Sequence, residues 1–558
     1  MSDMRPEDPL YPDWLPEPTV AEEQLWDAFR FGRQVEYWFE DGLRAEVIAA
    51  LALGAVPAVP GRTAGVRIRG ATVVGELDLR HGTVEVPLTM LHCRFTDALR
   101  LEESTTRSID LTGSRLPRIA ATGAHVRGSL TLARAEITGG GYTAASLQKI
   151  TVDTDLNCRR LRCTGRLALT GARIGAVLDL AHAVVDNPGA VAVTLRGASV
   201  AGNVYFDRAT IAGAVRLPGM TVGGLLTLAE TRLGAPPRGD AEFAHQCLVG
   251  DSLVVGGDLH FDHLTAVAQL DLTGARIGGA LSFKAAALGT LVPDWPALML
   301  TSATIGRGLY IGDGFRAEST VRLTGTQIGG HLDLYKMAPD SGPLQLYYAK
   351  ATTVRDGRTS NGRYIDGGVE SWPADVQLDG FSYDAFDPYL PAHERIKLLR
   401  RQPGYAAQPY EFMAAYYREL GHDVAAREIL IEKERVRHAD FHRMSRVGSV
   451  ISNTAIGYGY LPRRAAYIAV TVQILASVFY AFAVPTPIHP GDRVTYYPVL
   501  YAADLFVPIV HFGQTDAFQS HGLAACVAYV LPYLGWALGI AIVAGASRTL
   551  SKGGGGIV

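Results

Sequence analysis

Residues 274–283, GARIGGALSF, decide the fold of this chain, because they are one copy of a motif that recurs between positions 70 and 334. Apolar residues alternate with small or polar ones in this copy, which is the period of a β-strand and not of a helix. The clearest other copies begin at Gly70, Gly123, Gly171, Gly197, Gly219 and Gly325. Starts at positions 197, 208 and 219 are eleven residues apart, so the pattern predicts a stacked array of 11-residue half-repeats.

The repeat predicts a mainly β fold whose bulk is a parallel β-solenoid over 65–336. One face of each short strand lines a narrow core, and the glycines allow bends or close approach where a coil turns. Three insertions, 186–192, 235–246 and 290–300, are expected to project from the array as loops.

The regions on either side of the array differ from it in composition. We expect a disordered tail at 1–20, a helical cap over the first coil at 21–64, an irregular connector rich in Asp, Gly, Ser, Tyr and Pro at 337–390, a helical hairpin at 391–440 and a juxtamembrane stretch at 441–464. The hairpin has the spacing of a single helical-repeat unit. Such a unit needs a partner surface to bury its apolar face.

Two apolar runs near the C-terminus, 465–484 and 523–546, contain no Asp, Glu, Lys or Arg. At 1.5 Å per helical residue, each is long enough to cross roughly 30 Å of hydrocarbon. The sequence therefore predicts a two-span membrane region over 465–546, followed by a short tail at 547–558.

The charges beside these runs predict the topology. Arg463 and Arg464 precede the first run, and Arg548 and Lys552 follow the second, whereas the connecting segment 485–521 has only Arg493. Because Lys and Arg near the spans favour the cytoplasmic side, both termini are expected inside a multi-pass plasma-membrane protein. The acidic, proline-rich N-terminus lacks the features of a secretory signal, which agrees with a cytosolic solenoid.

The connecting segment contains YYPVLYAADLFVPIVHFGQTDAF, 496–518, which is too apolar for a water-exposed loop. We expect a short helix from Pro498 that ends at Pro508, with Gly513 and Gln514 in the returning chain. The order of span, short apolar helix, return and span is that of two-span tetrameric channels.

Asp504 lies in the middle of this segment, where an ionised carboxylate is costly unless it faces water or a partner. In one placement the helix is re-entrant, and a ring of Asp504 side chains in an oligomer favours cations. In the other it is an interfacial helix, with Asp504 among the headgroups and Tyr496, Tyr497 and Tyr501 as an aromatic belt. The sequence leaves both open.

Five phrases carry a resemblance to known proteins: IRGATVVGELDLR, QLDGFSYD, QPYEFMAAYYRELGHDVAAREIL, GYGYLPRRA and YYPVLYAADLFVPIVHFGQ. From Arg44 onward the chain resembles actinobacterial two-span β-solenoid membrane proteins often labelled membrane-associated oxidoreductases. Its layout is also similar to the membrane effectors of Hailong-type anti-phage systems. That resemblance implies an antiviral role, with a cytosolic sensing body that controls a channel-like membrane part.

The motifs of several function classes are missing from the sequence. It has no dinucleotide fingerprint, Walker motif or GxSxG, and its five cysteines include no CxxC, so an enzyme is the least favoured class and no cofactor is expected. His260 with Asp262 and His263, and His438 with His442, are the best metal candidates, but each group lacks a clear third ligand site, so no metal is expected. A net charge of -3 gives no nucleic-acid signal.

Three functions follow from these patterns, in decreasing order of preference. The first is a homo-oligomeric membrane protein in which the cytosolic solenoid senses an unknown protein or small ligand and controls an ion-channel-like pore. The second is a membrane-tethered scaffold for cytosolic partners. The third is the oxidoreductase that the family label implies. The apolar connecting segment favours the first, because a tether has no need of it.

Overall fold

The fold is described from a computed structural model, in residues 12, 14–38, 42–139, 143–234, 245–360, 363–439, 462–489, 495–507 and 509–550. These residues belong to two compact units, Met1–Pro403 and Gly404–Val558. The first unit contains the solenoid, and the second contains the apolar helices.

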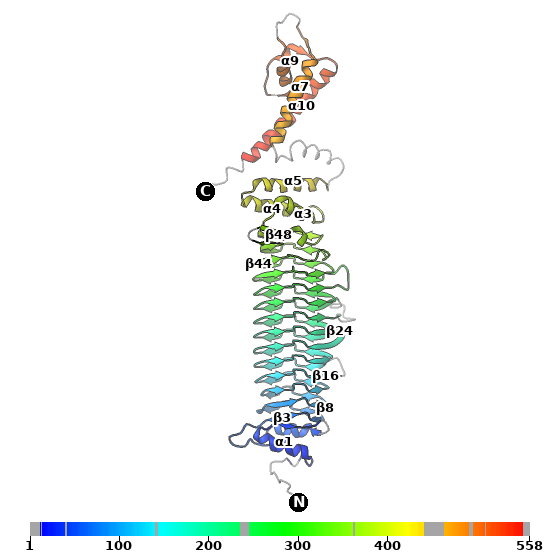
Figure 1. Ribbon diagram of the computed structural model, residues 1–558, viewed down its shortest axis with the longest axis vertical. Helices are drawn as coiled ribbons and strands as arrows, with labels where there is room; N and C mark the ends of the chain where they lie inside the picture. Colours follow the sequence, from blue (N-terminus) through cyan, green and yellow to red (C-terminus); the bar gives the residue numbers. More distant parts are fainter. Residues whose placement is uncertain are drawn as a thin grey trace, which may run out of the picture. The chain divides into compact units, whose positions relative to one another are not determined.

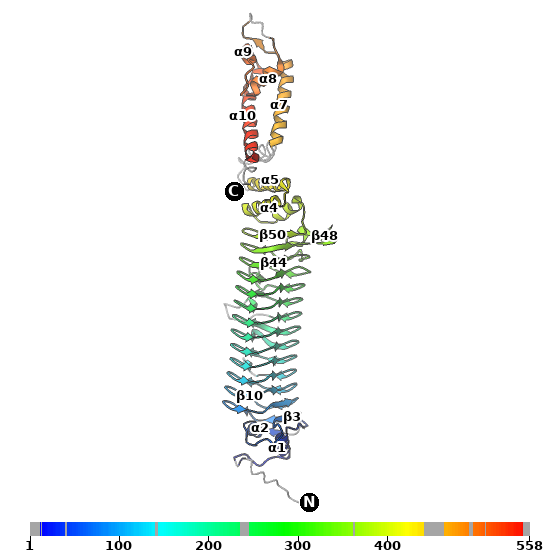
Figure 2. The ribbon, with the colours of Figure 1, turned by 90° about the vertical axis from the view of Figure 1, so that its left-hand side faces the viewer.

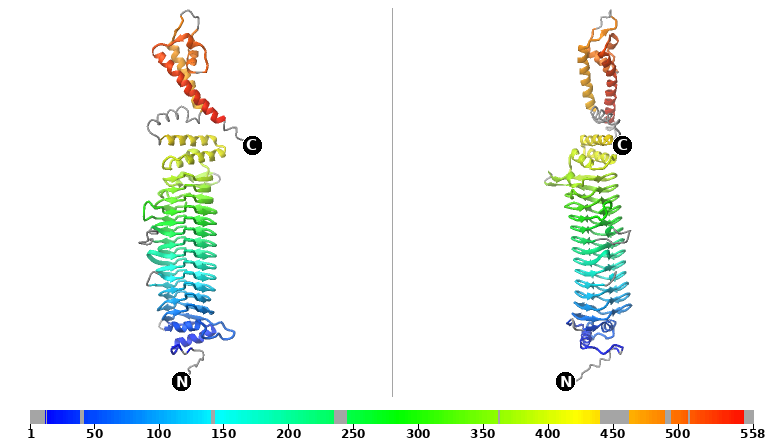
Figure 3. Two further views of the ribbon diagram at one scale, coloured as in Figure 1. Left: turned by 180° about the vertical axis from the view of Figure 1, so that it is seen from behind. Right: turned by 90° about the vertical axis from the view of Figure 1, so that its right-hand side faces the viewer.

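The first unit is a parallel β-solenoid of about 12 turns, as the repeat predicted. Figures 1 and 3 show its coils stacked on one another from β3 (Val66–Arg69) to β50 (Ser382–Asp387). Each regular coil places two short strands in each of two parallel sheets, for example β36 (Arg276–Ile277) and β37 (Leu281–Ser282) in one and β38 (Ala287–Leu288) and β39 (Leu298–Met299) in the other. Thr221 pairs with Ser199, and Arg276 with Val254, so a regular coil takes 22 residues, two 11-residue halves.

The core is a column of apolar side chains that lie directly above one another from coil to coil. Phe261 and Phe283 are fully buried and stack at 4.8 Å between ring centroids, with Phe315 beyond them at 6.0 Å from Phe283. Burial of each such side chain contributes about 1.5–3 kcal/mol, and the strands share their backbone hydrogen bonds with the coils on either side. Regular stacking of one apolar column therefore stabilises the array.

The motif glycines have two separate roles. Gly274 lies at a corner with a φ of 66°, a conformation that glycine adopts without strain. Gly278 lies at a point of close approach, because a Cβ atom there would be 2.4 Å from the carbonyl oxygen of Gly256 in the coil below. Both roles, the bend and the close approach, were expected from the sequence.

The first coil is covered by a small cap. Helix α1 (Val20–Phe31) begins at a capping box between Thr19 and Glu22, and α2 (Ala45–Ala52) follows two short strands, β1 (Val35–Glu36) and β2 (Gly42–Arg44). These strands pair in parallel with β3 and with β4 (Thr72–Val74), so they cover the backbone edge of the array. A partly buried ion pair of 2.5 Å between Glu22 and Arg44 joins the two parts of the cap.

The prediction of an irregular connector at 337–390 is wrong for most of that region. Strands β45 (Leu344–Gln345), β46 (Lys350–Arg355), β49 (Val376–Gln377) and β50 continue the two sheets in register. Leu344 pairs with Val376, which lies 32 positions later, because a hairpin of β47 (Gly357–Ser360) and β48 (Arg363–Gly367) and the 3-10 turn η1 (Gly368–Ser371) are inserted between them. This insertion hides the period in the sequence, and β48 projects from the stack in Figure 2.

The predicted loop at 186–192 lies within the long strand β24 (Val184–Thr194), where residues 187–190 have no pairing partner in the register and form a bulge. The strand pairs with β27 (Thr210–Arg216) through register shifts, which absorb the extra residues without interrupting the sheet. Most of the 235–246 insertion lies outside the described residues, and Gln246 begins β31 (Gln246–Val249). The 290–300 insertion is turn and coil up to β39.

A buried charge network closes the far end of the array. Arg395, in α3 (Ala392–Leu399), and Asp356 are both fully buried and form an ion pair. The indole of Trp372 donates a hydrogen bond of 2.8 Å to Asp356, and the Arg395 guanidinium lies 3.8 Å from the ring centroid of Phe386. Through these contacts α3 packs against Asp356, which follows β46, and against Phe386 of β50.

The second unit begins with two helices, α4 (Ala407–Glu419) and α5 (Asp423–Ala439), which pack on each other where the helical hairpin was predicted. The juxtamembrane stretch lies outside the described residues up to Pro462. The apolar helices follow: α7 (Pro462–Phe482), α8 (Pro498–Phe506), α9 (Gln514–Ala517) and α10 (Leu523–Leu550). Helix α10 continues into the predicted tail, because nothing in 547–550 breaks it.

Candidate membrane site

Helix α10 contains the one segment among the described residues that is long and apolar enough to cross a membrane, Leu523–Ile540. Only 17 % of this segment is buried within the protein, whereas the core helix of a soluble protein is mostly buried. The apolar part of α7, Ala466–Phe482, is shorter. The structure thus supports membrane association through one span, where the sequence predicted two.

Both helices carry large apolar side chains on their outer surfaces. The most exposed members are Tyr467, Val470, Ile474, Leu475 and Phe482 on α7, and Leu523, Tyr529, Tyr533, Ile540 and Val543 on α10. A continuous surface of this kind is unfavourable in water and is typical of helices that contact lipid or another chain.

Helix α8 lies between α7 and α10 (Figure 2). Its N-terminal turn reaches the middle of α7, because the Gln473 side chain donates a hydrogen bond of 3.3 Å to the carbonyl oxygen of Val499. Gln473 stands nine residues before the end of α7 at Phe482, which corresponds to about 13 Å along the helix. The connecting segment therefore enters the helical hairpin to about half the length of α7.

The tyrosines of this segment mostly point inward. Tyr501 is 2 % exposed, its ring lies 4.9 Å from that of Tyr480 on α7, and its hydroxyl is 2.9 Å from that of Ser520. Tyr496 donates a hydrogen bond of 2.8 Å to the carbonyl oxygen of Tyr480. Of the three tyrosines considered for an aromatic belt, Tyr497 alone is exposed, at 54 %. Tyr501 and Tyr496 therefore pack against α7 rather than forming an exposed belt.

Asp504 holds the returning chain in place. Its side chain is fully buried and accepts hydrogen bonds from the backbone N–H groups of Phe512, Gln514 and Thr515, at 2.7 Å for Gln514 and 3.2 Å for Thr515. Three amide donors offset the cost of placing a carboxylate among apolar side chains. In this conformation Asp504 organises the loop between α8 and α9.

Gly513 and Gln514 complete the return. Gly513 has a φ of 75° and precedes α9, where a side chain would be strained. The Gln514 side chain accepts a hydrogen bond of 3.1 Å from the N–H of Tyr497 and donates one of 3.3 Å to the carbonyl oxygen of Thr495. It therefore joins the two ends of the connecting segment. Pro508 lies outside the described residues.

Sequence reasoning missed one polar pair in the same loop. His511 and Asp516 lie 3.0 Å apart between Nε2 and the carboxylate, and their side chains are 65 % and 74 % exposed. The Nδ1 atom of His511 is 3.8 Å from Asp504. The signal was present in the sequence, since both residues are polar in an apolar segment, but only the turn after α8 brings them together.

The predicted topology anchors are only partly described. Arg463 and Arg464 lie in the first turn of α7, and Arg548 lies in the last turn of α10. Lys552 lies outside the described residues.

The candidate sites on the solenoid have structural partners. Asp262 accepts from His260, at 3.3 Å, and its hydrogen bond raises the pKa of that imidazole. No group of three or more His, Cys, Asp or Glu side chains that could hold a metal occurs within the described residues. Cys158 and Cys163 are buried, and loss of solvation raises the pKa of Cys163 to about 12, which does not suit redox chemistry.

No protein-family model, no curated protein and no solved structure matches this chain.

Proposed function

We propose that the C-terminal helices form the pore unit of an oligomeric, channel-like membrane protein, and that the solenoid is its cytosolic sensing body. The observation that carries the proposal is the depth of α8, which begins beside Gln473 in the middle of α7. A short helix held at this depth with an ordered return is unnecessary for a tether. It is the arrangement by which two-span channels place polar groups near a central axis.

In this proposal α7 and α10 both cross the bilayer, and α8 enters it from the outer side. With the first turn of α7 at the interface, the 17 residues of Ala466–Phe482 cover about 26 Å, which is at the lower end of the range for a span. Arg463, Arg464, Arg548 and Lys552 keep both ends on the cytoplasmic side. The protein is then a multi-pass plasma-membrane protein with cytoplasmic termini.

Several copies are required, because two helices cannot enclose a pore. The exposed apolar side chains of α7 and α10 provide surface both for lipid and for neighbouring copies. We assign Asp504 the role of a positioning residue that holds the loop. The exposed His511 and Asp516 are the polar groups that would face the axis, where a ring of Asp516 side chains favours cations.

The oligomeric state provides the first test. The full-length protein in lipid nanodiscs is expected to be a symmetric oligomer, counted by single-molecule photobleaching of one label per chain. A protein that stays monomeric at every lipid-to-protein ratio would rule out the pore.

Ion flux provides the second test. Sealed liposomes that contain the protein should conduct cations in preference to anions, and Asp516→Asn should reduce that preference. Glu318→Gln is the matched control, because Glu318 is an exposed carboxylate on the solenoid. Equal selectivity of the wild type and Asp516→Asn would contradict the assignment of Asp516.

A membrane-tethered scaffold is the second candidate, and the regularity of the solenoid favours it. Outward-facing side chains form straight rows, such as Thr221, Ser199 and Arg173 on paired strands, and such rows suit an extended partner. Replacement of residues 462–550 by an unrelated two-span anchor separates the candidates. A scaffold keeps its partners and its cellular activity after this exchange, and a channel loses its activity.

A further inference from the structure

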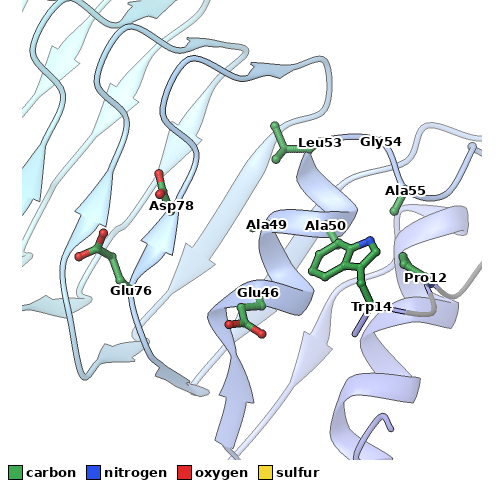
Figure 4. Close-up of a pocket in the computed structure, with 10 residues that line it drawn as sticks. All are labelled: Pro12, Trp14, Glu46, Ala49, Ala50, Leu53, Gly54, Ala55, Glu76 and Asp78. Atoms are coloured by element: carbon green, nitrogen blue, oxygen red, sulfur yellow. The ribbon is translucent and has the colours of Figure 1, made fainter. Parts of the chain in front are cut away.

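A cavity of about 530 Å³ lies in the N-terminal cap, between α2 and the first coils of the solenoid. Figure 4 shows the Trp14 indole beside Ala50 on one side, and Glu46, Glu76 and Asp78 on the other. Its volume is within the usual range of small-molecule sites, about 300–1,000 Å³. Nothing in the pore proposal uses this cavity, which lies wholly in the Met1–Pro403 unit.

The floor of the cavity is apolar and its aromatic wall is open. Ala50 of α2 and Leu53, which follows that helix, line it, and the Trp14 side chain is 68 % exposed. An indole left this open is costly in water and provides a face for a flat or apolar group. Trp is also the aromatic residue with the strongest attraction for cations.

The other wall is acidic, and its charges are not balanced. Arg80 pairs with Asp78 at 2.6 Å, and Arg100 pairs with Glu76 at 3.3 Å and with Glu102 at 2.8 Å. Glu46 has no ion-pair partner among the described residues. Three carboxylates, Glu46, Glu76 and Asp78, line the cavity, and no lining residue is a cation. Arg80 and Arg100 pair with Asp78 and Glu76, so Glu46 leaves this edge with an excess of negative charge.

Two of the carboxylates at this edge have lowered pKa values. The hydrogen bond from Arg80 lowers the pKa of Asp78 to about 2, and Arg100 lowers the pKa of Glu102 against the opposing effect of burial. Glu46 lies in the first turn of α2.

We propose that this cavity binds a small organic cation, an ammonium group carried on an aromatic or other apolar body. The apolar part lies against Trp14 and Leu53, and the ammonium group lies toward Glu46. An anion is disfavoured by the excess negative charge, and a bare inorganic cation makes no use of the apolar wall.

Three probes of similar size and different charge test this site on the full-length protein in detergent micelles by isothermal titration calorimetry. They are benzyltrimethylammonium, benzyl alcohol and phenylacetate. The cation is expected to bind at least tenfold more tightly than the other two. Equal affinities for all three, or no saturable binding of the cation, would overturn the proposal.

Two variants locate the binding. Trp14→Leu and Glu46→Gln should each weaken binding of the cation about two- to fivefold, and the combination should weaken it further. Trp38→Leu is the matched control, since Trp38 is 84 % exposed and does not line the cavity. Because Glu46→Gln preserves the shape of an exposed side chain, it tests the charge even if Trp14→Leu disturbs the cap. Wild-type affinity in both variants would place the binding elsewhere and refute the assignment.

Discussion

The carboxylate of Asp504 provides the sharpest test of the membrane unit, because it holds the return loop through three backbone amides. Asp504→Ala removes all three acceptors at once. Hydrogen bonds to a charged group contribute about 1.5–3 kcal/mol each, and 1.4 kcal/mol corresponds to a factor of ten. The amides of Phe512, Gln514 and Thr515 should then exchange with solvent about 10- to 150-fold faster than in the wild type.

Hydrogen–deuterium exchange followed by mass spectrometry measures this change on peptides that cover 509–518. Asp504→Asn retains one acceptor oxygen without the charge, so its exchange rates should fall between those of the wild type and Asp504→Ala. Asp516→Asn is the matched control, because the Asp516 side chain is 74 % exposed and accepts none of these bonds. Exchange in Asp504→Ala at the wild-type rate would show that Asp504 does not organise the loop.

Three further predictions concern the solenoid and the cysteines. Arg395→Met should lower the free energy of unfolding of the solenoid by about 3–5 kcal/mol in urea denaturation, because it leaves the buried Asp356 without its ion-pair partner. The double variant that also carries Asp356→Leu should recover much of that loss. Equal stability of Arg395→Met and the wild type would contradict this prediction. Gly278→Ala should lower the free energy of unfolding by about 1–3 kcal/mol, since its Cβ would lie 2.4 Å from a backbone oxygen. Ala285→Gly should leave the stability unchanged or raise it, because Ala285 has a φ of 53°. If thermal denaturation showed Ala285→Gly to be the less stable variant, the close packing of the coils would be contradicted. Iodoacetamide at pH 8 should leave Cys93, Cys158, Cys163 and Cys247 unmodified, because all four thiols are buried and burial raises their pKa values, to about 11 for Cys93 and about 12 for Cys163 and Cys247. These thiols stay protonated and unreactive until the pH approaches those values, and modification of any of the four in the native protein at pH 8 would refute the burial.

The solenoid could be predicted because its signal is local and repeated. Each copy contains the alternating apolar residues that a short strand needs, and many copies with the same spacing leave little choice of fold. The prediction failed where the spacing changed. At 337–390 the residues that line the core, such as Leu344 and Val376, are present, but the inserted hairpin moves them out of period. Strand pairing depends on which residues meet in space, so the array continued where the sequence pattern did not.

The membrane site also had one feature that the sequence predicted and one that it did not. The short helix after Pro498 followed from composition and a helix-breaking proline, and α8 begins there. The partners of Asp504 did not follow, because backbone amides eight to eleven residues away have no sequence signal. The cavity beside Trp14 could not be predicted from the sequence either, because Glu76 and Asp78 lie in the solenoid whereas Ala50 lies in the cap helix α2.

By itself the sequence determined the parallel β-solenoid, its 11-residue half-repeat and the apolar character of the C-terminal helices, because all three depend on the order of apolar and polar residues along a short stretch of chain. Only the tertiary structure decided that the array extends to Asp387, that α8 lies beside the middle of α7 and that Asp504 binds the loop behind it. Those features depend on contacts between residues far apart in the chain, and such contacts form only after the local elements have packed.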